Sequence, residues 1–381
     1  MKIALIIEHL SASRGGRERS TGQIATELAR RGHAVTVLCR SARDAPAGVE
    51  IRQLGTSPRG RAARAAHFVA AASGEIARGG FDVAHATLPV PGANVYQPRG
   101  GLVGAQAAAS VRRRRGLLRA LFATCEPLNL LRRKMGELER RVVGDEKVLC
   151  LAVSDMVRRE FLHYYGRGQG VRVVFNGVDA PGGDEARRQQ WRGELRSRLG
   201  IPAGDCVFLT VAKNFALKGV PEALEAFARH VAERGGDAGA HFVAVGQALT
   251  GWYERRARRR RVSRLMHFPG PAEDASPWYA AADVCVLLTW YDPCSRVVLE
   301  ALRAGLPAVT TAFNGAAEVL GDGAGVVVAS PDDTAGAAAA MRTLADPAAR
   351  RQAAGACRAV AGRLTMERQV DELLAAYEEV A

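Results

Sequence analysis

The strongest constraint on the fold is an alternation of short apolar runs, glycine turns and helical stretches that starts at the first residues. Residues 2–7 form an apolar run, a loop ends at Gly15-Gly16, a helical stretch reaches residue 31, and residues 33–38 form a second apolar run. A strand, a glycine turn, a helix and a strand within about 40 residues are typical of a βαβ unit and predict a parallel sheet. The first run stops at Glu8, so we interpret it as a buried strand and not as a signal peptide.

The alternation continues along the chain and falls into two series. The first includes runs at 81–85, 148–153 and 171–175 and ends at a Pro- and Gly-rich stretch, residues 179–184. The second starts at Val207 and includes runs at 241–245, 266–268, 283–289, 307–311 and 325–328. We therefore predict an α/β fold of two doubly wound, Rossmann-like domains. The predicted parts are a domain over 1–178, a linker over 179–186, a domain over 187–365 and a helix over 366–381.

The charge of the chain is concentrated in its N-terminal half. Residues 1–180 contain 29 Lys and Arg against 15 Asp and Glu, whereas the remaining residues are balanced, so the whole net charge of +14 belongs to the first half. That half is expected to face a polyanion. Only 5 of the 53 basic residues are Lys, and two of these, Lys213 and Lys218, follow the first strand of the second domain.

Two carboxylates mark the most informative stretch, residues 289–302. Asp292 lies in the turn after a strand, and Glu300 lies one to two turns into the following helix. Both are expected to face the crevice at the carboxyl ends of the strands, where they can bind sugar hydroxyls. The amides of Ser295, Arg296 and Val297 at the helix start can hold an anion. The alternative is that Asp292 is a plain turn acid and Glu300 a solvated helix residue.

The loop that contains Lys213 and Lys218-Gly219 also follows a strand and leads into a helix. Two point charges at this place suit a diphosphate. The alternative is that both are solvated loop lysines.

In this order and at these spacings, the motifs resemble family 4 of the retaining glycosyltransferases, which have the GT-B architecture. The resemblance rests on the Asp292-x7-Glu300 pair with its Ala301–Pro307 continuation, on the Lys213…Lys218-Gly219 loop, and on Gly15-Gly16-Arg17-Glu18-Arg19. It covers nearly the whole chain. It implies that the two Rossmann-like domains face each other across an interdomain cleft and that the helix over 366–381 can pack back on the first domain. Among subgroups, the stretches Tyr291–Ala301 and Tyr96–Gly101 are most similar to lipopolysaccharide-core glucosyltransferases.

The resemblance implies roles for individual residues. Glu300 would bind the donor ribose, Asp292 the transferred sugar, and Lys213 and Lys218 the diphosphate, which Gly15 and Gly16 would approach from the other domain. Many relatives have a catalytic His in a His-Gly segment. Here the matching segment is Arg99-Gly100-Gly101, so Arg99 and His85 are the candidates for that part. The implied reaction is retaining transfer of a hexose, such as glucose from UDP-glucose, without a metal.

A basic, leucine-containing stretch, residues 111–134, predicts contact with an anionic membrane. Its proposed membrane residues are Arg112, Arg113, Arg114, Arg115, Leu117, Leu118, Arg119, Leu121 and Phe122. The alternative is a surface helix that packs its leucines on the core.

The remaining features narrow the partners. We find no DxD motif, His/Asp cluster or Cys-x-x-Cys pair, so no metal and no cofactor are expected beyond the nucleotide-sugar substrate. Scattered cysteines favour a reducing cytoplasm, and the expected location is the inner face of the bacterial cytoplasmic membrane. The expected acceptor is a glycan or lipid-linked saccharide of the cell envelope, such as lipopolysaccharide core. Other possibilities are a nucleotide-sugar epimerase, a phosphorylase, or a basic nucleic-acid-binding protein, although no nucleic-acid-binding motif is present.

Overall fold

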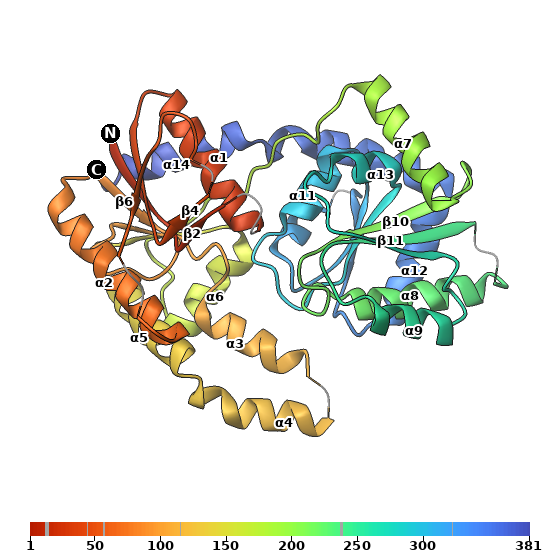
Figure 1. Cartoon of the computed structure of the whole chain (residues 1–381), viewed down its shortest axis with the longest axis horizontal. Helices are drawn as coiled ribbons and strands as arrows, with labels where there is room; N and C mark the ends of the chain where they lie inside the picture. The colour runs from red at the N-terminus through yellow and green to blue at the C-terminus, as the bar shows by residue number, and fades with distance from the viewer. Residues whose placement is uncertain (12–14, 44, 56–57, 115, 237–238, 322) are drawn as a thin grey trace. The chain divides into compact units, whose positions relative to one another are not determined.

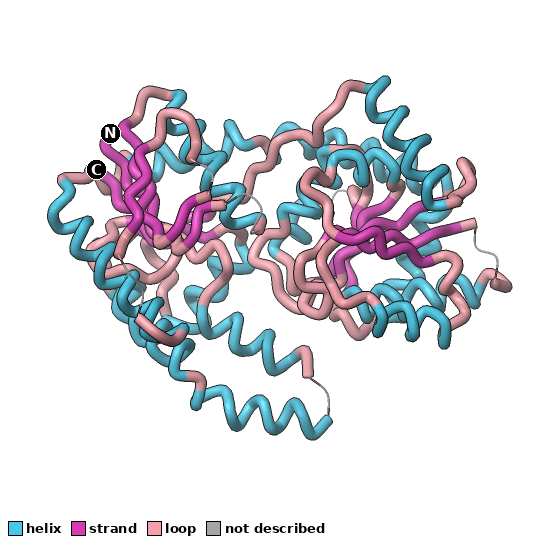
Figure 2. The backbone as a smooth tube through the Cα atoms, in the orientation of Figure 1, coloured by secondary structure: helices cyan, strands magenta, loops and turns pink. Residues whose placement is uncertain are grey.

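The computed structural model describes residues 1–11, 15–43, 45–55, 58–114, 116–236, 239–321 and 323–381. The chain forms two compact units. Unit 1 comprises Met1–Gly177 together with Met366–Ala381, and unit 2 comprises Val178–Thr365. Each unit has a parallel sheet with helices on both faces (Figure 2).

Unit 1 contains a seven-stranded parallel sheet in the order β5-β3-β1-β6-β7-β8-β9. Its strands are β1 (Lys2–Ile6), β3 (Ala34–Cys39), β5 (Glu50–Gln53), β6 (Val83–Ala86), β7 (Val95–Tyr96), β8 (Leu149–Ala152) and β9 (Val171–Val173), and a separate pair is formed by β2 (His9–Leu10) and β4 (Ser41–Ala42). Its helices are α1 (Gly16–Arg30), α2 (Arg61–Gly79), α3 (Val103–Arg112), α4 (Gly116–Cys125), η1 (Glu126–Leu128), α5 (Leu130–Gly144), α6 (Asp155–Tyr165) and α14 (Met366–Tyr377).

The first strand is apolar throughout because both of its faces are covered. Ile3 and Leu5 pack with α1 and α14, whereas Ala4 and Ile6 pack with α2 on the other face (Figure 1). This double burial explains a continuous apolar run in place of alternation. The helix over residues 366–377 thus belongs to the core of unit 1.

Unit 2 contains a six-stranded parallel sheet in the order β12-β11-β10-β13-β14-β15. Its strands are β10 (Cys206–Val211), β11 (Ala240–Val245), β12 (Met266–Gly270), β13 (Val284–Leu287), β14 (Ala308–Thr311) and β15 (Gly325–Val328). Its helices are α7 (Glu185–Leu199), α8 (Val220–Glu233), α9 (Gly251–Arg259), α10 (Ser276–Ala281), α11 (Arg296–Arg303), η2 (Gly315–Val319), α12 (Thr334–Ala345), α13 (Pro347–Ala361) and η3 (Gly362–Leu364). The linker expected over 179–186 is shorter, because α7 begins at Glu185, where the Asp184 side chain accepts from the Arg187 amide.

The segment expected to be one basic amphipathic stretch is divided between helices. Arg112 is the last residue of α3, whereas Arg119 lies in α4, so the spacing that places them on one helical face is wrong. Gly116 at φ +55° starts the new helix, and Arg115 lies outside the described residues.

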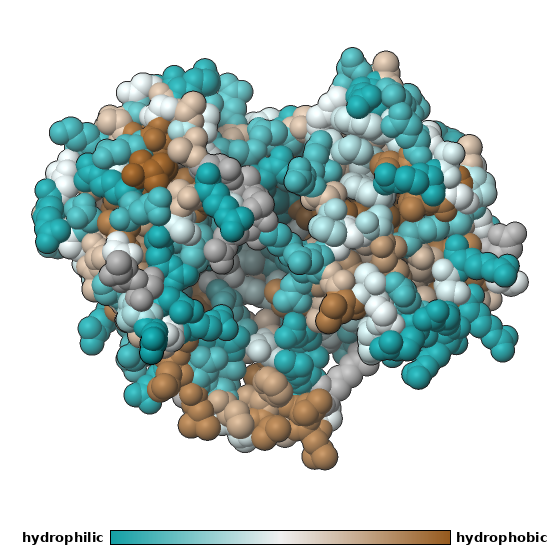
Figure 3. Space-filling view, viewed as in Figure 1, coloured by the Kyte–Doolittle hydropathy of each residue, from teal (hydrophilic) through white to brown (hydrophobic). Residues whose placement is uncertain are grey.

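The leucines of α4 do not pack on a core. No residue of α4 is buried, and Leu117, Leu118 and Leu121 are 91%, 56% and 54% exposed. Figure 3 shows the resulting apolar patch along α4. The Arg114 guanidinium lies 4.2 Å from the centre of the Phe122 ring, which keeps a cation at the edge of the patch. No helix within the described ranges is long and apolar enough to cross a bilayer.

Candidate functional site

The strand order of unit 2 places two loops together at one edge of its sheet. β10 lies between β11 and β13, because the chain runs outward from β10 through β11 to β12 and then crosses back to β13 on the other side of β10. Such a switch point is where α/β sheets bind ligands, outside the carboxyl ends of the strands. The loop after β10 contains Lys213 and Lys218, and the loop after β13 contains Asp292.

The two loops are tied to each other through their backbones. The Leu217 carbonyl accepts hydrogen bonds from the Trp290 amide (3.0 Å) and the Thr289 hydroxyl (3.2 Å). Gly219 has φ +71°, and a Cβ there would lie 1.7 Å from the Leu288 carbonyl oxygen. Only glycine fits this close approach. The close approach of Gly219 to Leu288 therefore fixes the conformation of the loop and, with it, the position of the adjacent Lys218.

Lys218 and Asp292 form an ion pair between Nζ and Oδ2. Lys218 is half-buried, and Asp292 is 9% exposed. The backbone of Asp292 is held in turn, since its amide donates to the Phe313 carbonyl and its carbonyl accepts from the Gly315 amide, both at 2.9 Å. Asp292 is therefore not a freely solvated turn acid. A cation and a carboxylate at one point suit a ligand with both phosphate and hydroxyl groups.

Glu300 is held on α11 by two neighbours. Its carboxylate accepts from the Tyr279 hydroxyl at 3.0 Å and lies 3.5 Å from the Arg296 guanidinium. Burial and the adjacent carboxylate raise the pKa of the Tyr279 hydroxyl well above its usual value, so the hydroxyl remains a donor. With 15% of its side chain exposed, Glu300 is not a solvated helix residue.

One predicted anion-binding group is already engaged. The Ser295 amide donates to the Asn314 side chain at 3.1 Å, which also accepts from the Ala316 amide. Ser295 is therefore not the free donor that the sequence predicts. Arg296 and Val297 are the first two residues of α11. Lys213, directly after the β10 strand, is exposed, whereas Lys218 is half-buried.

The predicted residues of unit 1 have different surroundings. Gly15 precedes α1 and its carbonyl accepts from the Arg19 amide (3.0 Å), while Gly16 is the first residue of the helix. The buried Arg99 guanidinium donates to the Ser20 hydroxyl and to the Asn176 side chain (3.2 Å). Arg99 therefore holds α1 and the segment after β9 together.

His85 is buried in β6. Its Nδ1 lies 2.6 Å from the Tyr377 hydroxyl of α14. Burial and the positive charge of Arg99 lower the pKa of His85 to about 3, so the ring is neutral near pH 7. At 2% exposure, His85 is covered by protein.

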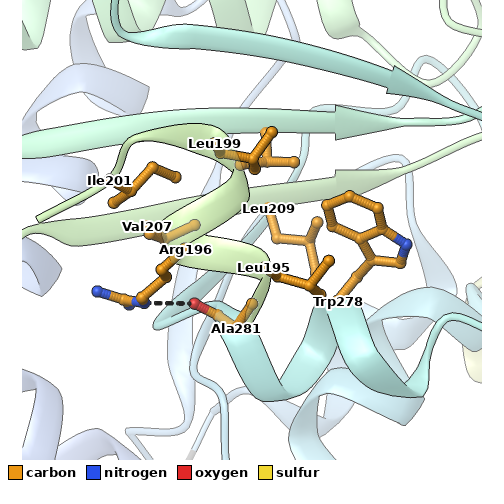
Figure 4. Close-up of a pocket in the computed structure, with 9 residues that line it drawn as sticks. Leu195, Arg196, Leu199, Ile201, Val207, Leu209, Trp278 and Ala281 are labelled. Carbon is orange, nitrogen blue, oxygen red and sulfur yellow. Dashed lines mark hydrogen bonds between the residues drawn. The ribbon is translucent and has the colours of Figure 1, made fainter. Parts of the chain in front are cut away.

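A small cavity in unit 2 has no part in this site. It has a volume of about 10 Å³ and is lined mainly by apolar side chains of α7, α10, β10 and β11 (Figure 4). Arg196 at its edge donates to the Ala281 carbonyl at 3.0 Å. A space of this size holds a water molecule at most. The cavity is a packing gap away from the carboxyl ends of the strands.

A much larger cavity in unit 1 was not predicted. It has a volume of about 880 Å³ and includes residues that follow β1 and β6, Glu8 and Thr87. Its lining includes Arg17, Arg40, Arg61, Arg64 and Arg132. The concentration of positive charge in residues 1–180 is the sequence signal for it, but no motif identifies these positions.

Two family models match the chain on either side of the linker. Residues 14–180 match the model described as Glycosyltransferase Family 4, and residues 205–346 match Glycosyl transferases group 1, which includes both loops at the unit 2 switch point. Together the two models match most of the chain, which belongs to these glycosyltransferase families.

Relatives of this glycosyltransferase have several different names. It is 32% identical over 271 residues to a D-inositol 3-phosphate glycosyltransferase of Geodermatophilus obscurus, a match that spans 64% of the chain and 56%, little more than half, of that relative. It is 26% identical over 325 residues to the lipopolysaccharide glucosyltransferase WaaG of Escherichia coli, covering 83% of the chain and 82% of WaaG.

Solved structures show the same fold. A crystal structure of WaaG superposes with a TM-score of 0.79 at 23% identity, over 100% of this chain and 99% of WaaG. Anabaena HepE in complex with UDP and glucose superposes with a TM-score of 0.71 at 18% identity, over the whole of both chains. The predicted doubly wound architecture is confirmed.

Proposed function

We propose that this glycosyltransferase moves a hexose from a nucleotide sugar, a UDP-sugar, to a glycan or lipid-linked acceptor such as lipopolysaccharide core. The transfer retains the anomeric configuration and uses no bound metal. The observation that carries the proposal is the Lys218–Asp292 pair at the switch point of unit 2, which is followed along the chain by the half-buried Glu300 on α11. The similarity to WaaG and the complex of HepE with UDP and glucose support this donor and acceptor class.

Each residue has a distinct part in the proposed donor site. Glu300, oriented by Tyr279 and Arg296, binds ribose hydroxyls. When the donor binds, Lys218 leaves its ion pair with Asp292 and binds the diphosphate, and Lys213 is the second cation there. Asp292 then binds hydroxyls of the transferred sugar. The positive charge of the lysines beside the diphosphate stabilises its departure, which is the difficult step. The acceptor hydroxyl attacks from the side of the leaving group.

We also propose that the enzyme binds the inner face of the cytoplasmic membrane through α4 and the basic residues beside it. Three leucines more than half exposed, next to Arg114 and Arg119, suit the boundary of an anionic bilayer. A bacterial envelope glycan linked to lipid is then within reach.

The donor site is tested by calorimetry on three variants with UDP and with UDP-glucose. Lys218→Ala and Glu300→Ala should each weaken UDP binding roughly tenfold to a hundredfold, because each removes a charged hydrogen bond from a partly buried site. Asp292→Ala should bind UDP as tightly as the wild type or more tightly, because Lys218 loses its competing partner, while turnover falls sharply. EDTA should leave the wild type active.

The matched control is Glu233→Ala, which removes an exposed carboxylate in the last turn of α8 that pairs with Arg342. It should leave UDP affinity unchanged. Unaltered UDP binding by both Lys218→Ala and Glu300→Ala would show that the site assignment is wrong. Product analysis with labelled donor separates transfer from epimerisation and phosphorolysis, which this fold can also perform.

A further inference from the structure

The large cavity of unit 1 lies at the switch point of its own sheet. β1 and β6 are neighbours there, and the segments that follow them supply Glu8 and Thr87 to the lining. Helices α1, α2, α3 and α5 supply most of the rest. The volume of about 880 Å³ is in the range of small-molecule sites. The cavity is therefore large enough for a saccharide and is built by one unit alone.

Most charges in the cavity are neutralised by the protein itself. Five arginines line it among the described residues, and three of these pair with carboxylates of the same unit: Arg17 with Glu18 (2.9 Å), Arg40 with Glu8 (3.2 Å) and Arg132 with Glu126. These pairs leave little net charge for a ligand.

Arg61 and Arg64 are different. Both lie in the first turn of α2, and neither side chain forms a hydrogen bond or ion pair with any described residue. No acidic residue lies in that turn. Because a helix start favours negative charge, two arginines there destabilise α2 slightly and do not support the fold.

The third carboxylate of the lining does not compensate these two cations. Glu139 is 1% exposed and accepts from the hydroxyls of Tyr96 and Tyr165 and from the Val103 amide (2.8 Å). Burial raises the pKa of Glu139. This carboxylate anchors the start of α3, so the positive charge of Arg61 and Arg64 remains available inside the cavity.

We propose that the cavity holds a phosphorylated saccharide acceptor and that Arg61 and Arg64 bind its phosphate group. This inference rests on the proposed transfer reaction. Arginines three residues apart on a helix lie on one face, and two guanidiniums match a dianionic phosphate better than a singly charged carboxylate. The phosphate can belong to a soluble sugar phosphate or to a lipid-linked saccharide.

The first test measures binding to the full chain saturated with UDP, so that the donor site is filled. Glucose 6-phosphate, glucose and glucuronate are the probes. The wild type should bind glucose 6-phosphate at least about tenfold more tightly than glucose, and more tightly than glucuronate. The double variant Arg61→Gln/Arg64→Gln should lose this preference. Arg78→Gln, at the other end of α2 in an exposed pair with Glu75, should keep it.

The second test distinguishes the two sources of the phosphate. Transfer to a lipid-linked saccharide is measured before and after phosphatase treatment of the acceptor. A preference for the phosphorylated form that disappears in the double variant supports the lipid-linked source, and a preference confined to glucose 6-phosphate supports the soluble one. Equal use of both members of each pair by the wild type, a preference for glucuronate, or a preference kept in the double variant overturns the proposal.

The outcome is separable from the proposed function. UDP binding and donor hydrolysis should be the same in the double variant as in the wild type, since Arg61 and Arg64 belong to unit 1. A wild type that fails to bind UDP removes the proposed donor site. In that case the preference of the wild type for glucose 6-phosphate over glucose, measured without UDP, still tests whether Arg61 and Arg64 bind phosphate.

Discussion

The switch points of the two sheets have the same topology but different openings. In unit 2 the loops are joined by the Lys218–Asp292 pair and by two hydrogen bonds to Leu217. In unit 1 the amide and hydroxyl of Thr87 bond the Ile6 carbonyl, and beyond this joint the lining separates around the large cavity. Strand order fixes where a ligand binds, and loop packing decides how much room it has.

The largest effect is expected from a methyl group added at the unit 2 switch point, compared with one added in the cavity of unit 1. Gly219→Ala places Cβ against the Leu288 carbonyl in a left-handed backbone conformation, so unit 2 should lose more than about 4 kcal/mol of unfolding free energy. Gly100→Ala, in the cavity of unit 1, meets only Gln106 and Arg17 side-chain atoms at 3.6 Å or more and should change it by less than about 1 kcal/mol. Urea unfolding measures both.

Similar losses in the two variants would show that the openings do not differ in tightness. A stable Gly219→Ala protein that binds UDP normally would remove the close approach of the two loops as a requirement of the donor site.

The second prediction concerns His85 in β6, one of the two strands whose ends lead to the unit 1 cavity. His85→Ala should lower unfolding free energy by about 2–3 kcal/mol, because it leaves the buried Tyr377 hydroxyl without its partner. The transfer rate should fall less than about tenfold, or 1.4 kcal/mol of barrier. Tyr377→Phe, the control, should reproduce part of the stability loss only. A thousandfold slower enzyme with normal UDP affinity would instead make His85 part of the reacting centre.

The third prediction compares the His85 ring with that of His230 in unit 2. The His230 ring packs against Phe208, and neither of its nitrogens is bonded to a described residue. Burial lowers the pKa of His230 to about 4. Between this value and about 6.5, the unfolded chain binds a proton that the folded chain does not, so stability falls as pH falls. For one such histidine the loss from pH 8 to pH 5 is about 2 kcal/mol.

His230→Leu should remove that part of the pH dependence, so that the variant gains stability relative to the wild type at pH 5 and little at pH 8. Denaturant titrations at both pH values measure the difference. Parallel pH profiles for the two proteins would contradict a buried neutral histidine.

The smallest change in stability is expected on α4, which has no buried residue and is therefore unlike the two switch points. Leu117→Ser, Leu118→Ser and Leu121→Ser should each change unfolding free energy by less than about 0.5 kcal/mol, because these side chains are exposed. Flotation with anionic vesicles should nevertheless weaken. Replacing Arg112–Arg114 with Gln should reduce it further, by about 1 kcal/mol per residue near the surface, without altering UDP affinity. Equal binding to neutral and anionic vesicles would refute the electrostatic part.

The sequence predicts those features that depend on local pattern. The helix expected after the Lys218-Gly219 loop is α8, which begins at Val220, since Gly219 and Pro221 mark its start. The convergence of Lys218 and Asp292 follows because parallel strands end at one edge. β7, of two residues, is too short for a periodicity signal.

Tertiary partners explain what was missed. The acceptor for the Ser295 amide is Asn314, nineteen residues away, on a loop whose approach no local pattern encodes. Arg61 and Arg64 look like any exposed basic helix face until β1 and β6 are placed side by side. Composition indicates a polyanion partner, but only the fold identifies which arginines form no ion pair with a described carboxylate.

The contribution of α14 reverses the usual order of folding during synthesis. Unit 2 is one continuous stretch, whereas the core of unit 1 includes Val370, Leu373 and Tyr377. Domains generally fold from the N-terminus as they emerge from the ribosome. Here the whole of unit 2 is synthesised before unit 1 is complete. Until α14 is made, the face of β1 that carries Ile3 and Leu5 stays uncovered. A nascent chain arrested before residue 366 would present that face to chaperones and proteases beside a finished neighbour.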